Sequence, residues 1–201
     1  MTIRTKEPDG ESNAKERYIE RWKTISAEVP DWSREKCDRY WVPSKRLIAT
    51  IRSYQYWRDR RGPVAFFMRK AAVLRHRWWS VVTGADIPLT TSIGGGLALT
   101  HPNGVVIHPD SVIGVNCLIF QQVTIGKGGR KPGSPQIGGH VDIGAGARIL
   151  GGVRIGNCVR IGANAVVLDD VPDNSTAVGI PARVIRHREN DSLSRDQIND
   201  R

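Results

Sequence analysis

Two histidines, His101 and His108, lie seven residues apart in the stretch LTHPNGVVIHPDSVIG, residues 99–114. An imidazole has an ordinary pKa of about 6.5, so near neutral pH it can take a proton from an alcohol and later return it. Such a base would activate a hydroxyl group for attack on a carbonyl carbon. A histidine in a turn is more often a solvated or structural residue, so the surrounding elements must decide between the two interpretations.

The chain has 201 residues, which is enough for one core or for one core with a small appendage. Its N-terminus has no apolar segment long enough for a secretion signal, and no apolar run approaches the ~20 residues that span a bilayer. We therefore expect a cytoplasmic protein. The cysteines Cys37, Cys117 and Cys158 are scattered without CxxC spacing, which favours reduced, packed thiols over disulfides or a thiolate zinc site.

A repeat of six residues dominates the second half of the chain. Four residues after each large aliphatic comes a small or medium residue, two before the next aliphatic, so both point to one face of a short strand. The large positions are Ile107, Ile113, Ile119, Ile125, Ile137, Ile143, Ile149, Ile155, Ile161 and Val167.

Short strands and turns repeated at a fixed interval predict a parallel β-solenoid, whose stability comes from stacking coil on coil. Glycine often follows the large aliphatic and suits a corner. The interval slips by two residues between Val105 and Ile107, and it skips one step at Lys131. The skip falls in GKGGRKPGSPQ, residues 126–136, which predicts a protruding loop. Interruptions of a regular scaffold are often functional.

The first 83 residues have a different pattern, and we expect them to form an N-terminal helical domain. The spacing in residues 64–82, after the Gly62-Pro63 breaker, predicts a helix, and residues 14–60 predict two or three more. The solenoid is then expected over 84–185, and a polar tail over 186–201.

Nearly all the net charge of +10 lies in residues 44–79, which hold 10 basic and 1 acidic side chain. With Trp57, Trp78, Trp79, Phe66 and Phe67, this segment has the composition of an amphipathic surface for anionic lipid or an acidic polymer. The alternative, which we favour, is a helical cap whose aromatic residues cover the end of the solenoid. No recognition motif supports nucleic-acid binding.

The repeat, the preceding helical segment, the loop and the closing AVGIPARVI (177–185) together resemble the hexapeptide-repeat acyltransferases. Within them, DIPLTTSIGGGLALTHPNGVVI (86–107) and FQQVTIG (120–126) most resemble the serine acetyltransferase family, which includes similar O-acetyltransferases of exopolysaccharide synthesis. The resemblance implies an all-β left-handed parallel β-helix with an N-terminal α-helical segment, assembled as a homotrimer, with acetyl-CoA bound between subunits. Whether two trimers pair stays open.

The resemblance also assigns the chemistry. His101 matches the histidine that deprotonates the acceptor hydroxyl, and Asp86, fifteen residues earlier, matches the aspartate that orients it. With eighteen residues per coil, we expect Asp86 to stack near residue 104, close to His101. Backbone N–H groups would stabilise the oxyanion, and no acyl-enzyme or metal is required. The remaining histidines are expected to be exposed (His108 and His140) or to lie in the basic helix and the tail (His76 and His187).

The acceptor is open between L-serine, as in cysteine biosynthesis, and a sugar hydroxyl of a surface polysaccharide. In the family, an Arg-His pair at the end of the protruding loop helps to hold the carboxylate of serine, but here Gly133 and Ser134 stand at those positions. Losing a bidentate guanidinium weakens carboxylate binding unless Arg130 or Lys131 replaces it. The candidate acceptor-binding residues are therefore Arg130, Lys131 and Ser134.

For acetyl-CoA, the resemblance points to Gly126, Ala145, Ala163 and Arg183. The small side chains of Ala145 and Ala163 would let the pantetheine arm run close to the backbone, while Gly126 and Arg183 match the cofactor groove and its closing segment. The repeat alone also accounts for these residues. Arg148, Arg154 and Arg160 look like a row of phosphate ligands, but their six-residue spacing sends them to three different faces.

The sequence leaves two other classes of function open, a zinc enzyme and a non-catalytic scaffold. The same solenoid supports zinc enzymes with histidine ligands shared between subunits, for which His101, His108 and His140 are the available residues, but the close histidine pair of that family is missing. In the second class, the solenoid would be a scaffold without catalytic activity. The loop does not satisfy the phosphate-binding pattern G-x-x-x-x-G-K-[ST].

Overall fold

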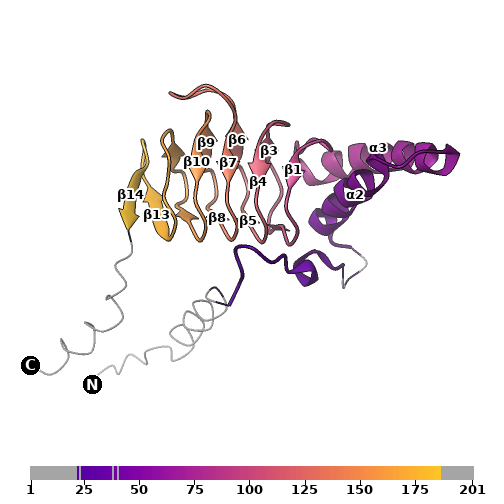
Figure 1. The fold of residues 1–201 in the computed structure, drawn as a ribbon, viewed down its shortest axis with the longest axis horizontal. Helices are drawn as coiled ribbons and strands as arrows, with labels where there is room; N and C mark the ends of the chain where they lie inside the picture. The colour runs from indigo at the N-terminus through magenta and orange to yellow at the C-terminus, as the bar shows by residue number, and fades with distance from the viewer. Residues whose placement is uncertain (1–21, 23, 38, 40, 187–201) are drawn as a thin grey trace, which may run out of the picture.

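A computed structural model describes residues 22, 24–37, 39 and 41–186. A 3-10 turn, η1 (Trp32–Glu35), precedes two helices, α2 (Pro43–Arg58) and α3 (Pro63–Thr83). Both helices begin with proline, whose missing N–H costs nothing in the first turn. The two helices lie side by side beyond one end of a column of short strands (Figure 1). No helix in the described part of the chain is long and apolar enough to cross a membrane.

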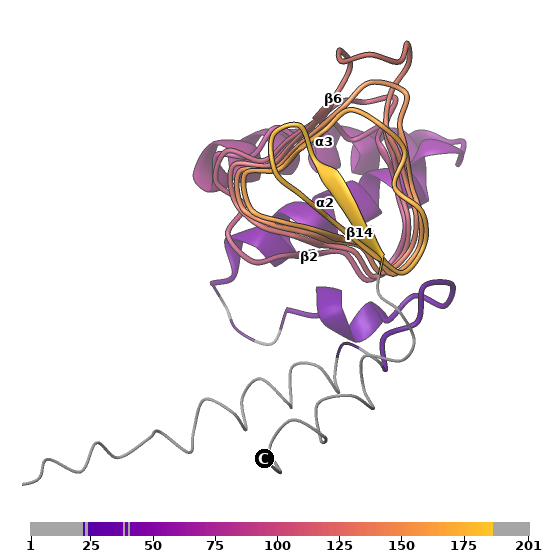
Figure 2. The ribbon, with the colours of Figure 1, turned by 90° about the vertical axis from the view of Figure 1, so that its left-hand side faces the viewer.

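The strands form three sheets that wrap into a triangular prism (Figure 2). Sheet A contains β3 (Val106–Ile107), β6 (Thr124–Gly126), β9 (Arg148–Leu150) and β12 (Val166–Val167). Sheet B contains β1 (Ser92–Ile93), β4 (Val112–Ile113), β7 (Gln136–Ile137) and β10 (Arg154–Ile155). Sheet C contains β2 (Ala98–Leu99), β5 (Leu118–Ile119), β8 (Asp142–Ile143), β11 (Arg160–Ile161), β13 (Ser175–Val178) and β14 (Arg183–Arg186).

The prediction of a parallel β-solenoid is confirmed. All neighbouring strands pair in parallel except β13 and β14, which close the column as an antiparallel pair. The chain passes from sheet B to C to A in each coil, so the prism has a B–C edge, a C–A edge and an A–B edge. The large aliphatics point inward, as with Ile119 and Ile125, which are fully buried. The six-residue repeat therefore supplies one side of the triangle per unit.

The corner glycines stand where a β-carbon is unwelcome, as their position in the repeat predicts. A Cβ on Gly114 would lie 2.3 Å from the carbonyl oxygen of Gly138 in the next coil, so glycine is needed there for close stacking. The left-handed backbone falls two residues later in the same corner, at Asn116, with φ of 58°. Asparagine tolerates that conformation better than most residues.

Helix α2 is the cap expected at the end of the solenoid. It buries Leu47, Ile48 and Ile51 in the core of the first coil. Arg52 donates to the carbonyl oxygens of Ile93 and Gly94, at 2.7 and 2.6 Å. The expectation that the aromatic residues of the basic segment make this cap is wrong for Phe66, Phe67 and Trp78, which are exposed, whereas Trp79 packs against the core.

Residues 24–37, which we call the strap, lie along the B–C edge. Asn116 is buried and donates to Ser26 and Val29 carbonyl oxygens while accepting from the Asp31 amide at 2.7 Å. Of the helices expected between residues 14 and 60, the described part contains η1, α2 and a single helical residue at Trp22; residues 14–21 and the tail with His187 lie outside the described residues.

His140 corrects a further expectation, because it is 2% exposed rather than on the surface. Its ring packs on Trp22, with ring centroids 4.3 Å apart. Burial lowers the pKa of His140. Burial also raises the pKa of the Cys117 thiol to about 12, so that thiol is packed and unreactive, as expected.

Candidate active site

His101 lies on the C–A edge, in a corner that contains two extra residues. Strand β2 begins at Ala98 and β3 at Val106, eight positions later, whereas β4 and β5 follow at six-residue steps, at Val112 and Leu118. The predicted slip is thus an enlarged corner holding His101, and the His101 side chain is exposed there.

The register places Asp86 differently from the expected stacking. Asp86 bridges to Val106 rather than to residue 104, because the two extra residues lengthen the coil between them. Its amide donates to the Val105 carbonyl at 2.8 Å, and its carbonyl accepts from the Ile107 amide at 2.9 Å. Among the described residues, no hydrogen bond or ion pair joins Asp86 to His101. The two segments are neighbours, since the amide of Gly104 donates to the carbonyl of Gly84 at 2.8 Å.

His76, on α3, is a neighbour of Asp86 that the sequence did not reveal. Burial lowers the pKa of His76, while a hydrogen bond with the Ile87 backbone and the charge of Asp86 raise it. Its Nδ1 atom lies 3.1 Å from Thr50 Oγ1 on α2. No sequence spacing could have shown this arrangement, because it depends on how the helices dock on the first coil.

The C–A edge continues from His101 through the corners of the following coils. The Gln122 amide donates to the Asn103 carbonyl at 2.9 Å, and the Asn164 amide donates to the Ala145 carbonyl at 2.8 Å. Ala145 is half-buried and Ala163 is exposed, so both small residues line the edge that holds His101. Two of the four residues expected to contact acetyl-CoA therefore lie on the same edge as His101.

Gln121 is a second residue on this edge that the sequence analysis missed. Its Oε1 atom is buried and has no hydrogen-bond partner within the described part of the chain. Its backbone carbonyl accepts from the Gly146 amide at 2.9 Å, which places it between the His101 and Ala145 levels. An unpaired buried amide oxygen is unusual in proteins and marks a position where a ligand or local rearrangement can supply a partner.

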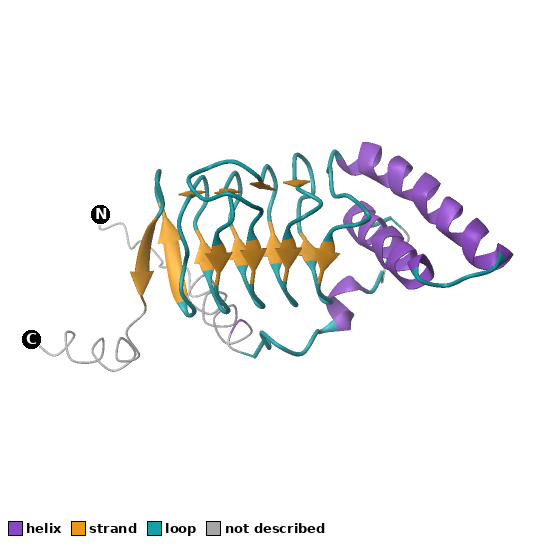
Figure 3. Cartoon of the chain, turned by 45° about the horizontal axis from the view of Figure 1, so that its top comes forward, coloured by secondary structure: helices purple, strands orange, loops and turns teal. Residues whose placement is uncertain are grey.

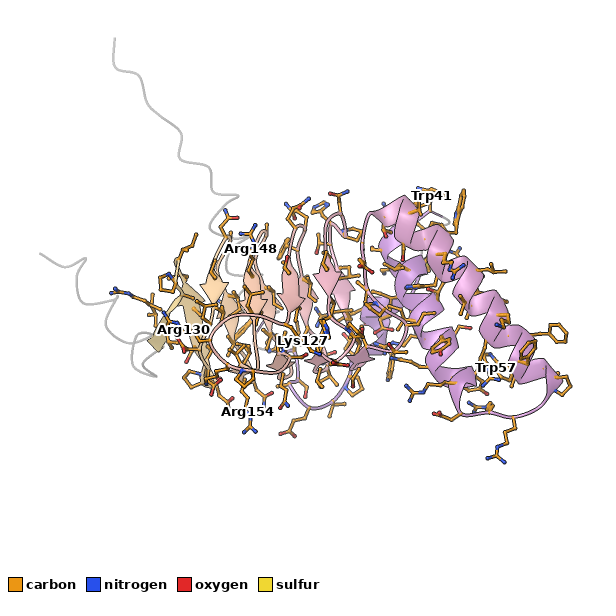
Figure 4. The ribbon with its side chains drawn as sticks, turned by 90° about the horizontal axis from the view of Figure 1, so that it is seen from above. Trp41, Trp57, Lys127, Arg130, Arg148 and Arg154 are labelled. Carbon is orange, nitrogen blue, oxygen red and sulfur yellow. The ribbon has the colours of Figure 1, made fainter. Side chains whose placement is uncertain are left out.

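The protruding loop lies on another edge. It leaves β6 at Gly126 and returns at Gln136, at the A–B edge (Figure 4). The loop packs on its own chain because Gly151 and Gly152 let it approach: the Gly152 amide donates to the Lys131 carbonyl at 3.0 Å, and a Cβ on Gly152 would lie 2.2 Å from the Pro132 oxygen.

The basic residues of the loop are paired with aspartates of the same chain. Arg130 contacts Asp169 at 3.1 Å, and Lys131 contacts Asp170 at 2.8 Å. All four side chains are largely exposed, so each pair contributes only about 0–1 kcal/mol and can exchange partners. Ser134 Oγ lies 3.5 Å from the Nδ1 atom of the half-buried His108. Within one chain, the residues expected to bind the acceptor therefore do not reach His101.

The remaining candidate residues also lie on different parts of the prism. Gly126 lies at the base of the loop, where an added Cβ would touch nothing within 4 Å, and Arg183 lies on β14 at the C-terminal end of sheet C. Arg148 and Arg154 point to different sides of the prism, as expected (Figure 4). His101, His108 and His140 occupy three different edges, so one chain cannot gather them around a zinc ion. No cluster of metal-ligand type occurs among the described residues.

A groove of about 930 Å³ runs between the strap and the outer face of sheet C. Ala98, Thr100 and Leu118 line it, and Thr100 is the neighbour of His101. The groove therefore reaches the residue that precedes His101.

Comparisons with known proteins agree with this architecture. The family model described as bacterial transferase hexapeptide (six repeats) matches residues 134–169. A curated serine acetyltransferase of Synechococcus elongatus is 46% identical over 107 residues, which are 52% of this chain and 44% of that protein. The soybean serine acetyltransferase complexed with serine matches with a TM-score of 0.60 and 38% identity, covering 71% of this chain and 57% of that one. A serine acetyltransferase in complex with CoA matches with a TM-score of 0.60 and 33% identity, covering 73% and 58%.

The coils and the repeat define a hexapeptide-repeat transferase fold. Within this class, the relatives and solved structures to which the chain is similar are serine acetyltransferases. The chain spans about half the length, or less, of the curated relatives it matches.

Proposed function

We propose that the protein transfers an acetyl group from acetyl-CoA to the hydroxyl of L-serine, with His101 as the general base. The observation that carries this proposal is the enlarged corner, which projects an exposed histidine on the same edge as Ala145 and Ala163. Support for the substrates comes from relatives that are serine acetyltransferases, one solved with serine and one with CoA.

In this mechanism His101 takes the proton of the serine hydroxyl as its oxygen attacks the thioester carbonyl. The new C–O bond forms, the C–S bond breaks, and the imidazolium returns its proton to the CoA thiolate. Asp86 is assigned the role of favouring the imidazolium, because its segment is hydrogen-bonded to the enlarged corner that holds His101. Exposed small residues on the C–A edge fit a pantetheine arm lying against the backbone.

A homotrimer would complete the site. The loop and His101 lie on different edges of one prism, so a neighbouring copy must supply Arg130, Lys131 and Ser134 to the His101 edge. Breaking the exposed pairs to Asp169 and Asp170 would free the two cations for the carboxylate of serine at a small cost.

A sugar hydroxyl is the alternative acceptor, and because it carries no carboxylate it is compatible with Arg130 and Lys131 staying paired with aspartates of their own chain. Release of CoA thiol from acetyl-CoA, measured with L-serine and separately with N-acetylglucosamine and galactose, decides between the two. Turnover with serine supports the proposal, and turnover with a sugar alone replaces the acceptor. No release with any of them contradicts acetyl transfer to these acceptors.

A further inference from the structure

Helix α3 presents its large apolar side chains to solvent and its small ones to the protein. Ala65 and Ala72 are buried on the side that faces the rest of the chain. The opposite side carries what we call the α3 stripe: Val64, Phe67, Leu74, Trp78 and Val81, with exposed fractions from 63% to 82%. A helix that only caps a solenoid would have the reverse orientation.

The α3 stripe is one continuous line along the helix. Its members follow one another at steps of three, seven, four and three residues, which are the spacings that share a helix face. At 1.5 Å per residue, the stripe is about 25 Å long. The helical hairpin extends away from the solenoid, so this face has no neighbour in the described part of the chain (Figure 3).

Basic side chains flank the stripe on both sides. By helical position, Lys70 and Arg77 lie along one side and Arg75 along the other, and all three are exposed. Helix α3 contains no aspartate or glutamate. Long basic side chains beside an apolar line can bury their methylene groups while the charged ends reach outward.

A pocket of about 380 Å³ lies between α3 and α2 at the same end of the molecule, with Trp41, Arg46, Arg75 and Trp79 among its lining residues. Two guanidinium groups and two indole rings suit an anionic group carried on an amphipathic molecule. Arg75, which flanks the α3 stripe, is one of the lining residues, so the pocket adjoins that flank of the stripe.

We propose that this surface binds the anionic face of a lipid bilayer, with the α3 stripe entering the interfacial region and the basic residues contacting lipid phosphates. Aromatic and aliphatic residues in line with Lys and Arg on the flanks are the features of a helix that lies in a membrane interface. A two-fold contact with a second copy of this chain fits less well, since it would bring the same positive flanks face to face.

The test is sedimentation of the purified full chain with vesicles of phosphatidylcholine alone or phosphatidylcholine mixed with phosphatidylglycerol. Binding is expected to the mixed vesicles, to fall with added salt, and to shift tryptophan emission to shorter wavelength. Two double variants should each weaken binding to the mixed vesicles at least about tenfold, because apolar insertion and charge act together. They are Phe67→Ser/Trp78→Ser, which removes apolar side chains, and Lys70→Gln/Arg77→Gln, which removes positive charge. Arg148→Gln/Arg154→Gln removes the same charge from the solenoid and should bind like the wild type.

Three results would overturn the proposal: no preference of the wild type for mixed vesicles, unchanged binding by Phe67→Ser/Trp78→Ser, or equal losses in the solenoid control. If Phe67→Ser/Trp78→Ser instead lowers the molar mass of the lipid-free protein, the α3 stripe is a contact between copies and the proposal also fails. Acetyl transfer without vesicles should be unchanged in all these variants, so the outcome is independent of the proposed enzyme activity.

Discussion

The amide of Gly104 donates to the carbonyl of Gly84 at 2.8 Å, which ties the enlarged corner of His101 to the residue that caps the C-terminus of α3. Gly84 has the left-handed conformation, with φ of 64°, and its amide closes the helix on the Ser80 carbonyl. The position of the candidate base therefore depends on a helix terminus as well as on the solenoid.

This contact predicts that Gly84→Ala is destabilising. Alanine in the left-handed region costs roughly 1–2 kcal/mol, and the added Cβ would lie 2.7 Å from the Nδ2 atom of Asn103, in the corner of His101. Chemical denaturation should show the loss, and kcat/KM should fall with it. Gly126→Ala is the control for stability, because its Cβ would meet nothing. Equal midpoints for the two variants would contradict the prediction.

His101→Ala is expected to lower kcat about a hundredfold or more, because general-base assistance is removed. Since the ring is exposed, the thermal midpoint and the oligomeric state should not change. Asp86→Asn should reduce kcat less than His101→Ala does, and combining the two should add little to the single histidine change. Retention of full turnover by His101→Ala would remove this residue from the mechanism, and the enlarged corner would need another explanation.

The sequence predicted the solenoid because each hexad needs only its own residues to define one side of the triangle. The same counting located both interruptions, since a slip of two and a skip of one step are visible in the positions of Ile107 and Ile137. It misplaced Asp86, because an interval of eighteen does not hold across the enlarged corner, where Asp86 bridges to Val106.

What could not be predicted depends on contacts between distant segments. The stretch GGHVD predicts a corner position for His140, yet His140 is buried, because Trp22, more than a hundred residues earlier in the chain, packs against it. The buried face of α3 could not be predicted either, because a mixed pattern of apolar and basic residues does not show which side of the helix packs on α2. Only the docked helices show that Ala72 faces inward and Phe67 outward.

The lowered pKa values of His76 and His140 predict a loss of stability in mild acid. Both rings stay neutral in the folded chain to lower pH than in the unfolded chain, where histidine titrates near 6.5. As the pH falls below about 6.5, the unfolded state binds protons that the folded state does not, so the free energy of unfolding decreases. Denaturation curves between pH 8 and 5 should show this decline, and His76→Gln/His140→Gln should flatten it. A decline of equal slope in that variant would assign it to other groups.

The small residues along the C–A edge predict that a bulky substitution there weakens the binding of acetyl-CoA. Ala163 is exposed on the edge that holds His101, so Ala163→Trp should leave the fold intact while filling the surface assigned to the pantetheine arm. The KM for acetyl-CoA should rise about tenfold or more, with little change in the KM for serine. Ala165→Leu is the contrasting change: Ala165 is fully buried inside the same corner, and overpacking there should cost about 1–3 kcal/mol of stability. If Ala163→Trp leaves the KM for acetyl-CoA unchanged, acetyl-CoA does not follow this edge.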